Sequence, residues 1–189
     1  MLRPLVAAAL ALVFSLNQEA LAVDKKYLTL ELEDGPVKIE LLPEVAPKHV
    51  ERIVTLAEQG AYDGVAFHRV IEGFMAQTGD VQHGEVQADG SVSPRAGTGG
   101  SDLGNVQAEF SDVPFERGTV GMARSQAPDS ANSQFFIMFD EASHLDGNYT
   151  AFGRVVEGME HVDAIKRGSG QGGTVSEPDK IIKATVSDG

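Results

Sequence analysis

One short segment of the sequence places a cation among apolar residues. In the run Val65-Ala66-Phe67-His68-Arg69-Val70-Ile71, the alternation of a β-strand puts Arg69 on the same side as Val65 and Phe67. An arginine on an apolar face is uncommon unless its charge is paired or it opens into a cleft. The alternative is an arginine whose stem packs on the sheet while its head reaches the edge. Spacing alone leaves both interpretations open.

The common catalytic motifs are absent from the sequence. The run Gly97-Thr98-Gly99-Gly100 lacks the Lys of a phosphate-binding loop, and Asp102 stands where a dinucleotide fingerprint needs its third glycine. The chain has no Cys and no Gly-x-Ser-x-Gly elbow, which excludes thiol and common serine nucleophiles. Its five histidines show no metal-ligand spacing. Asp80 and His83 are close but lie in a polar stretch, which favours a solvated loop, so we predict no metal site.

Length and charge narrow the class of protein. The chain has 189 residues, which suits one domain, and its apolar content of 42% is typical of globular proteins. Its formal net charge of −13 would repel a phosphate backbone, so we expect no nucleic-acid partner. The 21 glycines imply many turns and favour a β-rich fold.

The first 22 residues have the pattern of a secretory signal peptide. Arg3 is followed by an apolar run over residues 5–16 and then by Ala20-Leu21-Ala22, a small-residue cleavage site. A membrane span needs about 20 apolar residues, so this run is too short for stable insertion; the alternative is a buried core helix. We predict a cleaved signal over residues 1–22 and one domain over residues 23–189.

The rest of the chain predicts short strands and two helices. Alternating apolar residues over 27–32 and 37–41 flank Asp34-Gly35, which is typical of a hairpin. A helical stripe follows Pro47 and ends before Gly60, and a second helix fits residues 158–167. Further strands are expected at residues 65–71, 73–77, 119–123, 134–139, 151–156 and 180–186. Seven or eight strands with two helices favour a barrel or a sandwich.

One of these strands is apolar on both sides. Phe135, Ile137 and Phe139 share one face of residues 134–139, whereas Phe136 and Met138 share the other face with Gln134. One face can fill the core while the other lines a second apolar surface. The alternative is a strand that is buried on both sides.

The run from Phe67 to Asp80 resembles the signature of the cyclophilin family, F-H-R-x-[IV]-x-x-F-x-x-Q-x-G-D, at every defined position. Other matching blocks follow in register, and together they cover nearly all of residues 25–187: Gly97–Gly100, Gly121–Ala123, Ser133–Ile137, Leu145–Gly147 and Phe152-Gly153. The chain thus looks like a bacterial, exported cyclophilin-type peptidyl-prolyl cis-trans isomerase. The resemblance implies a mainly β fold: a closed eight-stranded antiparallel β-barrel capped by two α-helices.

The resemblance also implies a site. Arg69 would be the catalytic residue. The proline ring would sit on Phe74, Met75, Phe136 and Leu145, and the peptide backbone would be held by Gln77, Ala123 and Gln134. The groove rim would include Gly99, Arg124, His144 and Tyr149.

The absence of nucleophile, metal and cofactor motifs is consistent with this reaction. Rotation of an X-Pro bond crosses a barrier of about 18–20 kcal/mol without breaking a bond, so it needs no nucleophile, metal or cofactor. A planar guanidinium can stabilise the twisted amide, in which the proline nitrogen regains its lone pair. The expected partners are flexible proline-containing polypeptides. The protein is expected to be a monomer and to act in the periplasm. The alternative is a proline-binding chaperone with little turnover.

Three positions depart from the common family pattern. His144 replaces a frequent Trp, Tyr149 stands where His is common, and Arg124 stands where Asn often follows Met-Ala. Because imidazole offers a smaller apolar face than indole, we expect cyclosporin binding to be weak. The polar stretch over residues 81–94 resembles an insertion to which the sequence assigns no role.

Overall fold

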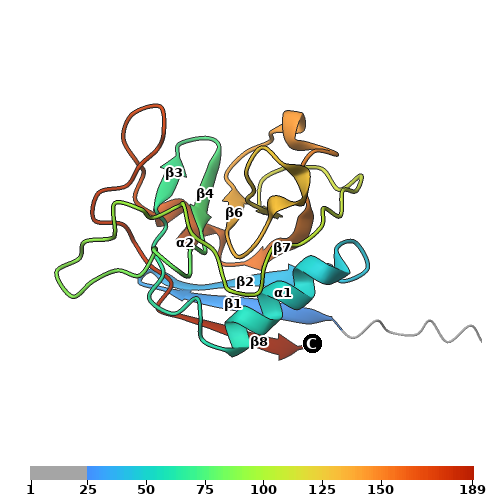
Figure 1. Ribbon diagram of the computed structural model, residues 1–189, viewed down its shortest axis with the longest axis horizontal. Coiled ribbons are helices and arrows are strands. Elements are labelled where there is room, and N and C mark those ends of the chain that lie inside the picture. The colour runs from blue at the N-terminus through green and yellow to red at the C-terminus, as the bar shows by residue number, and fades with distance from the viewer. Residues whose placement is uncertain (1–24) are drawn as a thin grey trace, which may run out of the picture.

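A curled antiparallel sheet forms the body of the protein (Figure 1). The computed structural model describes residues 25–189, so the predicted signal peptide lies outside the described residues. The strand order is β3-β4-β6-β5-β7-β2-β1-β8, and every neighbouring pair is antiparallel. The strands are β1 (Lys26–Leu32), β2 (Gly35–Leu41), β3 (Arg69–Ile71), β4 (Met75–Thr78), β5 (Thr119–Met122), β6 (Phe135–Met138), β7 (Ala151–Glu157) and β8 (Lys183–Asp188).

The predicted closed barrel is wrong. The sheet is an open half-barrel, in which β3 and β8 are the two edge strands and do not pair with each other. Near this gap, Val65 forms an isolated bridge to Glu85 while the next residue, Ala66, bridges to Lys180. Consecutive residues therefore pair with two different segments, and no continuous ladder can form. This splitting also explains why β3 has three residues where the alternation predicted a strand over 65–71.

The predicted hairpin is confirmed. In the β1–β2 pair, Leu28 lies opposite Ile39 and Leu30 opposite Val37, and all four side chains are fully buried. Alternation in the sequence therefore corresponds to one buried face of the hairpin.

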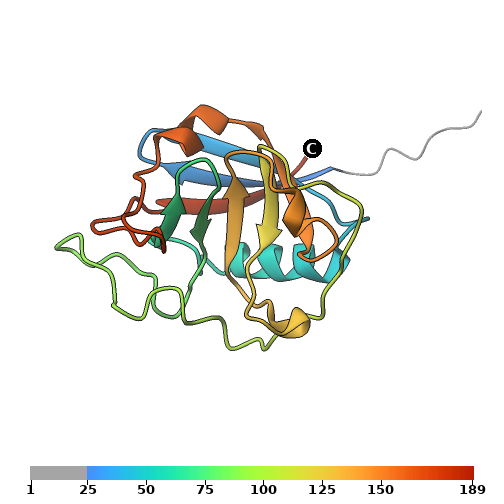
Figure 2. The same ribbon diagram turned by 90° about the horizontal axis from the view of Figure 1, so that it is seen from above.

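The two helices pack against strands β2, β7 and β8 (Figure 2). Helix α1 (Pro47–Glu58) begins with its predicted proline and contacts β7 and β8, whereas α2 (Met159–Ala164) contacts β2. The second helix is shorter than the predicted 158–167, because Ile165 turns to an extended conformation and is itself buried. Residues 81–104 have no strand or helix, and part of this segment forms a long loop that projects from the body of the protein (Figure 2).

Strand β6 separates two apolar clusters, as its two-faced pattern predicts. Phe135, Ile137 and the following Phe139 belong to the main core between the sheet and the helices. Phe136 and Met138 belong to a second cluster on the opposite face. One strand thus supports both the core and a second apolar surface.

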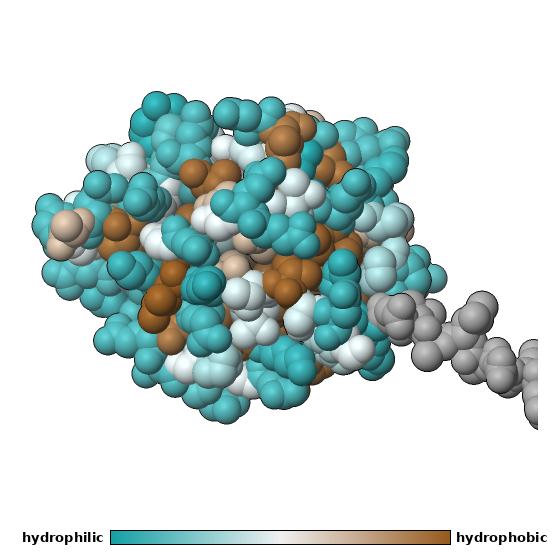
Figure 3. All heavy atoms as spheres, turned by 90° about the horizontal axis from the view of Figure 1, so that it is seen from below, coloured by the Kyte–Doolittle hydropathy of each residue, from teal (hydrophilic) through white to brown (hydrophobic). Residues whose placement is uncertain are grey.

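On the face shown in Figure 3, the surface is mostly hydrophilic and the hydrophobic residues lie in separate patches. The exposed large apolar side chains are spread along the chain rather than gathered in one segment: Leu103, Phe110, Val156 and Ile182. Within residues 25–189, no helix has the length and apolar character needed to cross a membrane.

A distant carboxylate caps the first turn of α1. The residue before the helix, Ala46, provides no side-chain cap. Instead, Glu109 accepts hydrogen bonds from the backbone N–H groups of Lys48 and His49 at 3.1 Å each, and its Oε2 lies 2.7 Å from His49 Nδ1. Burial of the Glu109 carboxylate favours its protonated form, but the bonds from His49 and the two N–H groups outweigh that effect and lower its pKa.

Replacing this carboxylate should destabilise the domain. We expect Glu109→Gln to lower the free energy of unfolding at pH 7 by about 1 kcal/mol, since the negative charge at a helix N-terminus is lost. Urea unfolding followed by circular dichroism measures the change. Glu44→Gln, an exposed position just before the same helix, is the matched control and should unfold like wild type; equal stability of all three proteins would contradict the capping role.

Candidate active site

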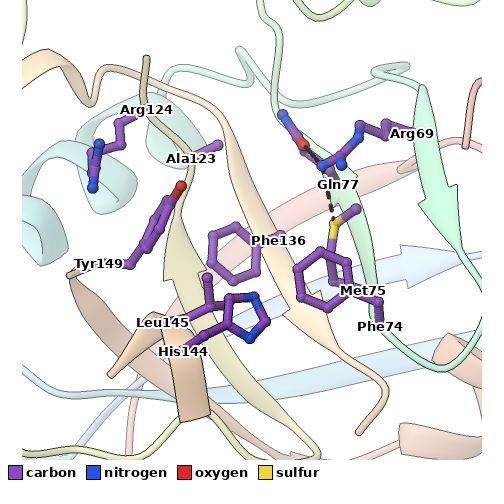
Figure 4. A pocket seen from close by; sticks show the side chains of 10 residues that line it. All are labelled: Arg69, Phe74, Met75, Gln77, Ala123, Arg124, Phe136, His144, Leu145 and Tyr149. Carbon is purple, nitrogen blue, oxygen red and sulfur yellow. Dashed lines mark hydrogen bonds between the residues drawn. The ribbon is translucent and has the colours of Figure 1, made fainter. Parts of the chain in front are cut away.

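A cavity of about 280 Å³ opens on the second apolar cluster (Figure 4). Arg69 lies on one side of it and Arg124 with Tyr149 on the other, with Phe136 between them (Figure 4). Ten of the twelve predicted site residues line this cavity: Arg69, Phe74, Met75, Gln77, Ala123, Arg124, Phe136, His144, Leu145 and Tyr149. The other two, Gly99 and Gln134, line an adjoining hollow of about 320 Å³ that shares Gln77, Ala123 and Arg124.

Strand register places the central residues in one row. Arg69 on β3 lies opposite Gln77 on β4, Gln77 lies opposite Phe136 on β6, and Phe136 lies opposite Gly121 on β5. Directly opposed residues in an antiparallel sheet point to the same face, so the row crosses four strands on the cavity side. Gly121 leaves room for this row, because an added Cβ would lie 2.5 Å from Phe115 and 2.7 Å from Phe136.

The floor of the cavity is apolar and tightly packed. Met75, Phe136 and Leu145 are each at most 6% exposed. The Phe136 ring stacks on Phe115 with centroids 5.7 Å apart, and Tyr149 meets it edge-on at 6.0 Å. The floor is therefore preformed and offers a rigid surface to a small apolar ring.

Neutral acceptors hold the Arg69 guanidinium in place. Its Nε donates to the carbonyl of Gly172 at 3.1 Å, and its Nη1 donates to Gln77 Oε1 at 3.1 Å and contacts Met75 Sδ at 4.0 Å. Among residues 25–189, no carboxylate forms an ion pair with it. The charge is thus oriented but not neutralised, and it is directed at the cavity.

The strand-parity prediction for Arg69 is wrong in one respect. Phe67 packs in the main core together with Val70, whereas a regular strand would place these two residues on opposite faces. The backbone is irregular at residues 67–68, and the alternation starts again at Arg69. Arg69 therefore faces the cavity while Phe67 faces the core.

A chain of hydrogen bonds runs from Arg69 to a buried carboxylate. Gln77 Nε2 donates to Gln134 Oε1 at 3.0 Å, and Gln134 Nε2 donates to the Gly99 carbonyl at 2.8 Å. The Gly99 N–H in turn donates to Asp80 Oδ2 at 2.9 Å. This chain connects both glutamines of the site to the glycine-rich loop.

Asp80 is a structural centre that the sequence did not reveal. We expected a solvated loop, but Asp80 is fully buried and accepts four backbone N–H bonds, from Gln82, His83, Gly97 and Gly99. Burial alone would raise the pKa of this carboxyl, and the four N–H groups together hold it below its usual value. The signal that could have found it is the spacing of an acid ahead of a glycine-rich loop, whose free N–H groups need an acceptor.

His68 packs behind the same loop. Its ring is 7% exposed and would lie 2.9 Å from a Cβ at Gly97, so that position needs a glycine. Burial lowers the pKa of His68, which favours the neutral ring. Within the described part of the chain, no three His, Asp or Glu side chains gather as a metal site requires.

Comparison with known proteins identifies the relatives of this chain. The family model described as cyclophilin type peptidyl-prolyl cis-trans isomerase/CLD matches residues 27–186. A probable peptidyl-prolyl cis-trans isomerase of Brucella suis is 57% identical over 182 residues, which cover 95% of this chain and 92% of that protein. A peptidyl-prolyl cis-trans isomerase of Helicobacter pylori is 36% identical and covers 82% of this chain and 88% of its own.

Solved structures share the fold. A cyclophilin from Hirschia baltica superposes with a TM-score of 0.70 at 27% identity, covering 85% of this chain and 76% of its own. A Cryptosporidium parvum cyclophilin type peptidyl-prolyl cis-trans isomerase, crystallised in the presence of the dipeptide Ala-Pro, has a TM-score of 0.73 at 24% identity and covers 85% of this chain and 98% of its own.

Asp80→Asn should weaken the loop that supports the glutamines. The variant keeps one carbonyl oxygen but turns an N–H₂ group toward two backbone donors, so we expect a loss of about 2 kcal/mol in unfolding free energy at pH 7. Because the folded pKa is depressed, the carboxylate stabilises the fold above its unfolded pKa of about 3.9, and this contribution is lost as pH falls through the folded value.

The difference between wild type and Asp80→Asn should therefore shrink below about pH 4. Urea unfolding at pH 7 and at pH 3 to 4 measures it. Asp102→Asn, at an exposed position in the same region, is the control and should follow wild type at every pH. An Asp80→Asn variant as stable as wild type at pH 7 would rule out this anchoring role.

Proposed function

Because the chain belongs to the cyclophilin-type peptidyl-prolyl cis-trans isomerase family and is a peptidyl-prolyl cis-trans isomerase, we propose that the cavity beside Arg69 is where it binds and rotates X-Pro bonds. The observation that carries this proposal is the position of Arg69 at the edge of a preformed apolar floor. Its guanidinium is held by Gly172 and Gln77 and has no carboxylate partner among the described residues.

The reaction needs a site that fits a twisted amide better than either planar isomer. Resonance in the X-Pro bond sets a barrier of about 18–20 kcal/mol, and twisting removes that resonance. The proline nitrogen then regains its lone pair and becomes a hydrogen-bond acceptor. Arg69 would donate to this nitrogen or to the prolyl carbonyl, and its planar fork is already oriented before the substrate arrives.

The floor would hold the ring while the preceding residue turns. Phe74, Met75, Phe136 and Leu145 present the apolar surface, and a fixed ring lets all the rotation occur on the other side of the bond. Gln77, Ala123 and Gln134 would bind the peptide backbone next to it. The hydrogen bonds that join Gln77 to Gln134 support this assignment, since they fix the direction of both amides.

The relatives support proline-containing peptides as the substrate class. The Cryptosporidium parvum protein was crystallised in the presence of Ala-Pro, a dipeptide that carries the bond in question. For this chain we infer flexible or unfolded segments, because the cavity is open enough to admit a chain but too small for a folded surface. A chaperone with little turnover would need the floor but not an oriented Arg69, so the geometry favours the enzyme.

We further propose that the protein is exported and assists the folding of exported proteins in the periplasm. The support is the pattern of Arg3, the apolar run over 5–16 and Ala20-Leu21-Ala22.

Two further expectations stay predictions: that the protein is a monomer and that it binds cyclosporin weakly. For cyclosporin, the relevant residue is His144, which lies beside Phe74 with ring centroids 5.8 Å apart. An imidazole at this place covers less area than an indole would.

Removing the Arg69 donor should abolish most of the activity. We expect Arg69→Ala to lower kcat/KM on proline tetrapeptides by about 100-fold or more, the scale of one lost oriented donor in other enzymes. Arg69→Lys should not restore full activity, because a point charge replaces a planar fork. Since rotation breaks no bond, added EDTA should leave the wild-type rate unchanged.

The control for this prediction is peptide binding. Arg69→Ala leaves the apolar floor in place, so the Kd for a proline peptide, measured by NMR titration, should change much less than kcat/KM. Wild-type activity in Arg69→Ala would refute the catalytic role. Inactivity of wild type with intact peptide binding would favour the chaperone.

The export proposal predicts a mature N-terminus at Val23. Expression of the full chain in a bacterial host, fractionation and N-terminal sequencing would measure it. Replacement of Ala20 and Ala22 by bulky residues should block processing and leave the precursor at the membrane. Recovery of soluble cytosolic protein that still starts at Met1 would contradict the proposal.

A further inference from the structure

The cavity and its neighbouring hollow carry a positive charge in a strongly acidic protein. The chain has 28 Asp and Glu against 15 Lys and Arg. None of the residues that line the two spaces is acidic, although two of them, Arg69 and Arg124, are arginines. A cleft concentrates the field of the charges that line it, so these two arginines favour an anionic group there over a cationic one.

Arg124 stands where the two spaces meet. It lines both of them, and its side chain is partly exposed. Its Nη2 donates to the carbonyl of Asn148 at 2.8 Å, its Nη1 donates to the carbonyl of Ser125 at 2.8 Å, and its guanidinium lies 4.3 Å from the centre of the Tyr149 ring. These contacts fix the guanidinium on the rim.

Every recorded partner of Arg124 is neutral. Its acceptors are backbone carbonyls, and no carboxylate of residues 25–189 pairs with it. Other arginines of the domain do have acidic partners, such as Arg117 with Asp163 and Arg154 with Glu116. A fixed cation that is reachable by solvent and lacks an internal counter-ion is available to a carboxylate of a bound peptide.

Arg69 is less available for this purpose. It is assigned to the twisted bond, and it lies across the floor from Arg124 (Figure 4). Gln77, Ala123 and Arg124 line both spaces. A substrate peptide whose proline sits on the floor and which continues into the adjoining hollow must therefore pass Arg124. The side chain that passes the rim is a residue close to the proline.

We propose that Arg124 selects substrates: the enzyme prefers proline segments that carry a carboxylate on a residue near the proline. The inference rests on the proposed location of the active site. Because the rim is partly exposed, the gain is that of a solvated ion pair, about two- to fivefold in kcat/KM, and it decreases with added salt.

The test uses capped peptides of one length, Xaa-Ala-Pro-Ala-Zaa. The reference has Gln at both variable positions, one peptide has Glu at Xaa, and another has Glu at Zaa. A protease-free NMR exchange assay gives kcat/KM for each, so the specificity of a coupling protease does not enter. For wild type, we expect one of the two Glu peptides to exceed the reference by about two- to fivefold at low salt.

Variants separate the rim charge from the general field. In Arg124→Gln the ratio of Glu to reference peptide should fall to about one, whereas Arg124→Lys should retain a preference because the charge remains. Lys183→Gln, which removes the same charge from an exposed position on β8, should keep the wild-type ratio.

The outcomes are distinguishable. Equal rates for all three peptides in wild type, or an undiminished preference in Arg124→Gln, would overturn the selection by Arg124 while leaving the active site assignment intact. A reference peptide that is not accelerated, or one whose acceleration is insensitive to Arg69→Ala, would instead overturn the active site assignment itself.

Discussion

The orientation of one guanidinium depends on a buried carboxylate that never touches it. Asp80 fixes Gly99, Gly99 fixes the amide of Gln134, Gln134 fixes that of Gln77, and Gln77 holds Arg69. The direction of each link is determined by its ends, because a carbonyl can only accept and a guanidinium can only donate. Neither glutamine can flip without breaking two bonds. A site that must recognise a brief, twisted geometry benefits from this rigidity, since nothing has to reorganise when the geometry appears.

The apolar half of the site is rigid for a different reason. Strand β6 presents Phe135 and Ile137 to the main core and Phe136 and Met138 to the cavity. Any movement of the floor would therefore disturb the packing of the core on the other side of the same strand, where large side chains are fully buried. The hydrogen-bonded chain and the two-faced strand meet at the Gln77–Phe136 cross-strand pair, which locates the polar and apolar parts of the groove relative to each other.

Local patterns in the sequence predicted the elements whose residues interact locally. The hairpin of β1 and β2, helix α1 and the two faces of β6 all follow from periodicity, because one period along the chain corresponds to one face. Three features could not be found this way. The gap between β3 and β8 depends on residues 65 and 66 pairing with two distant segments. The early end of α2 depends on the burial of Ile165. The role of Asp80 depends on a loop about 17 residues away. The set of site residues came from resemblance to a family rather than from periodicity; ten of those twelve residues lie around one cavity, and their individual roles stay predictions.

The pairing of the first strand with the last one has a consequence for how the chain acquires its structure. β1 begins at Lys26 and β8 ends at Asp188, and six residue pairs join them into one ladder. While the chain is being synthesised, β1 has no partner on that side until almost every residue is available, and closing so long a loop is entropically unfavourable and slow. The ladder between β1 and β8 can therefore form only after nearly all of the residues between them have been synthesised. The hairpin of β1 and β2 can form much earlier, so the other edge of β1 stays unpaired until β8 has been made, and an unpaired strand edge is open to pairing with other chains.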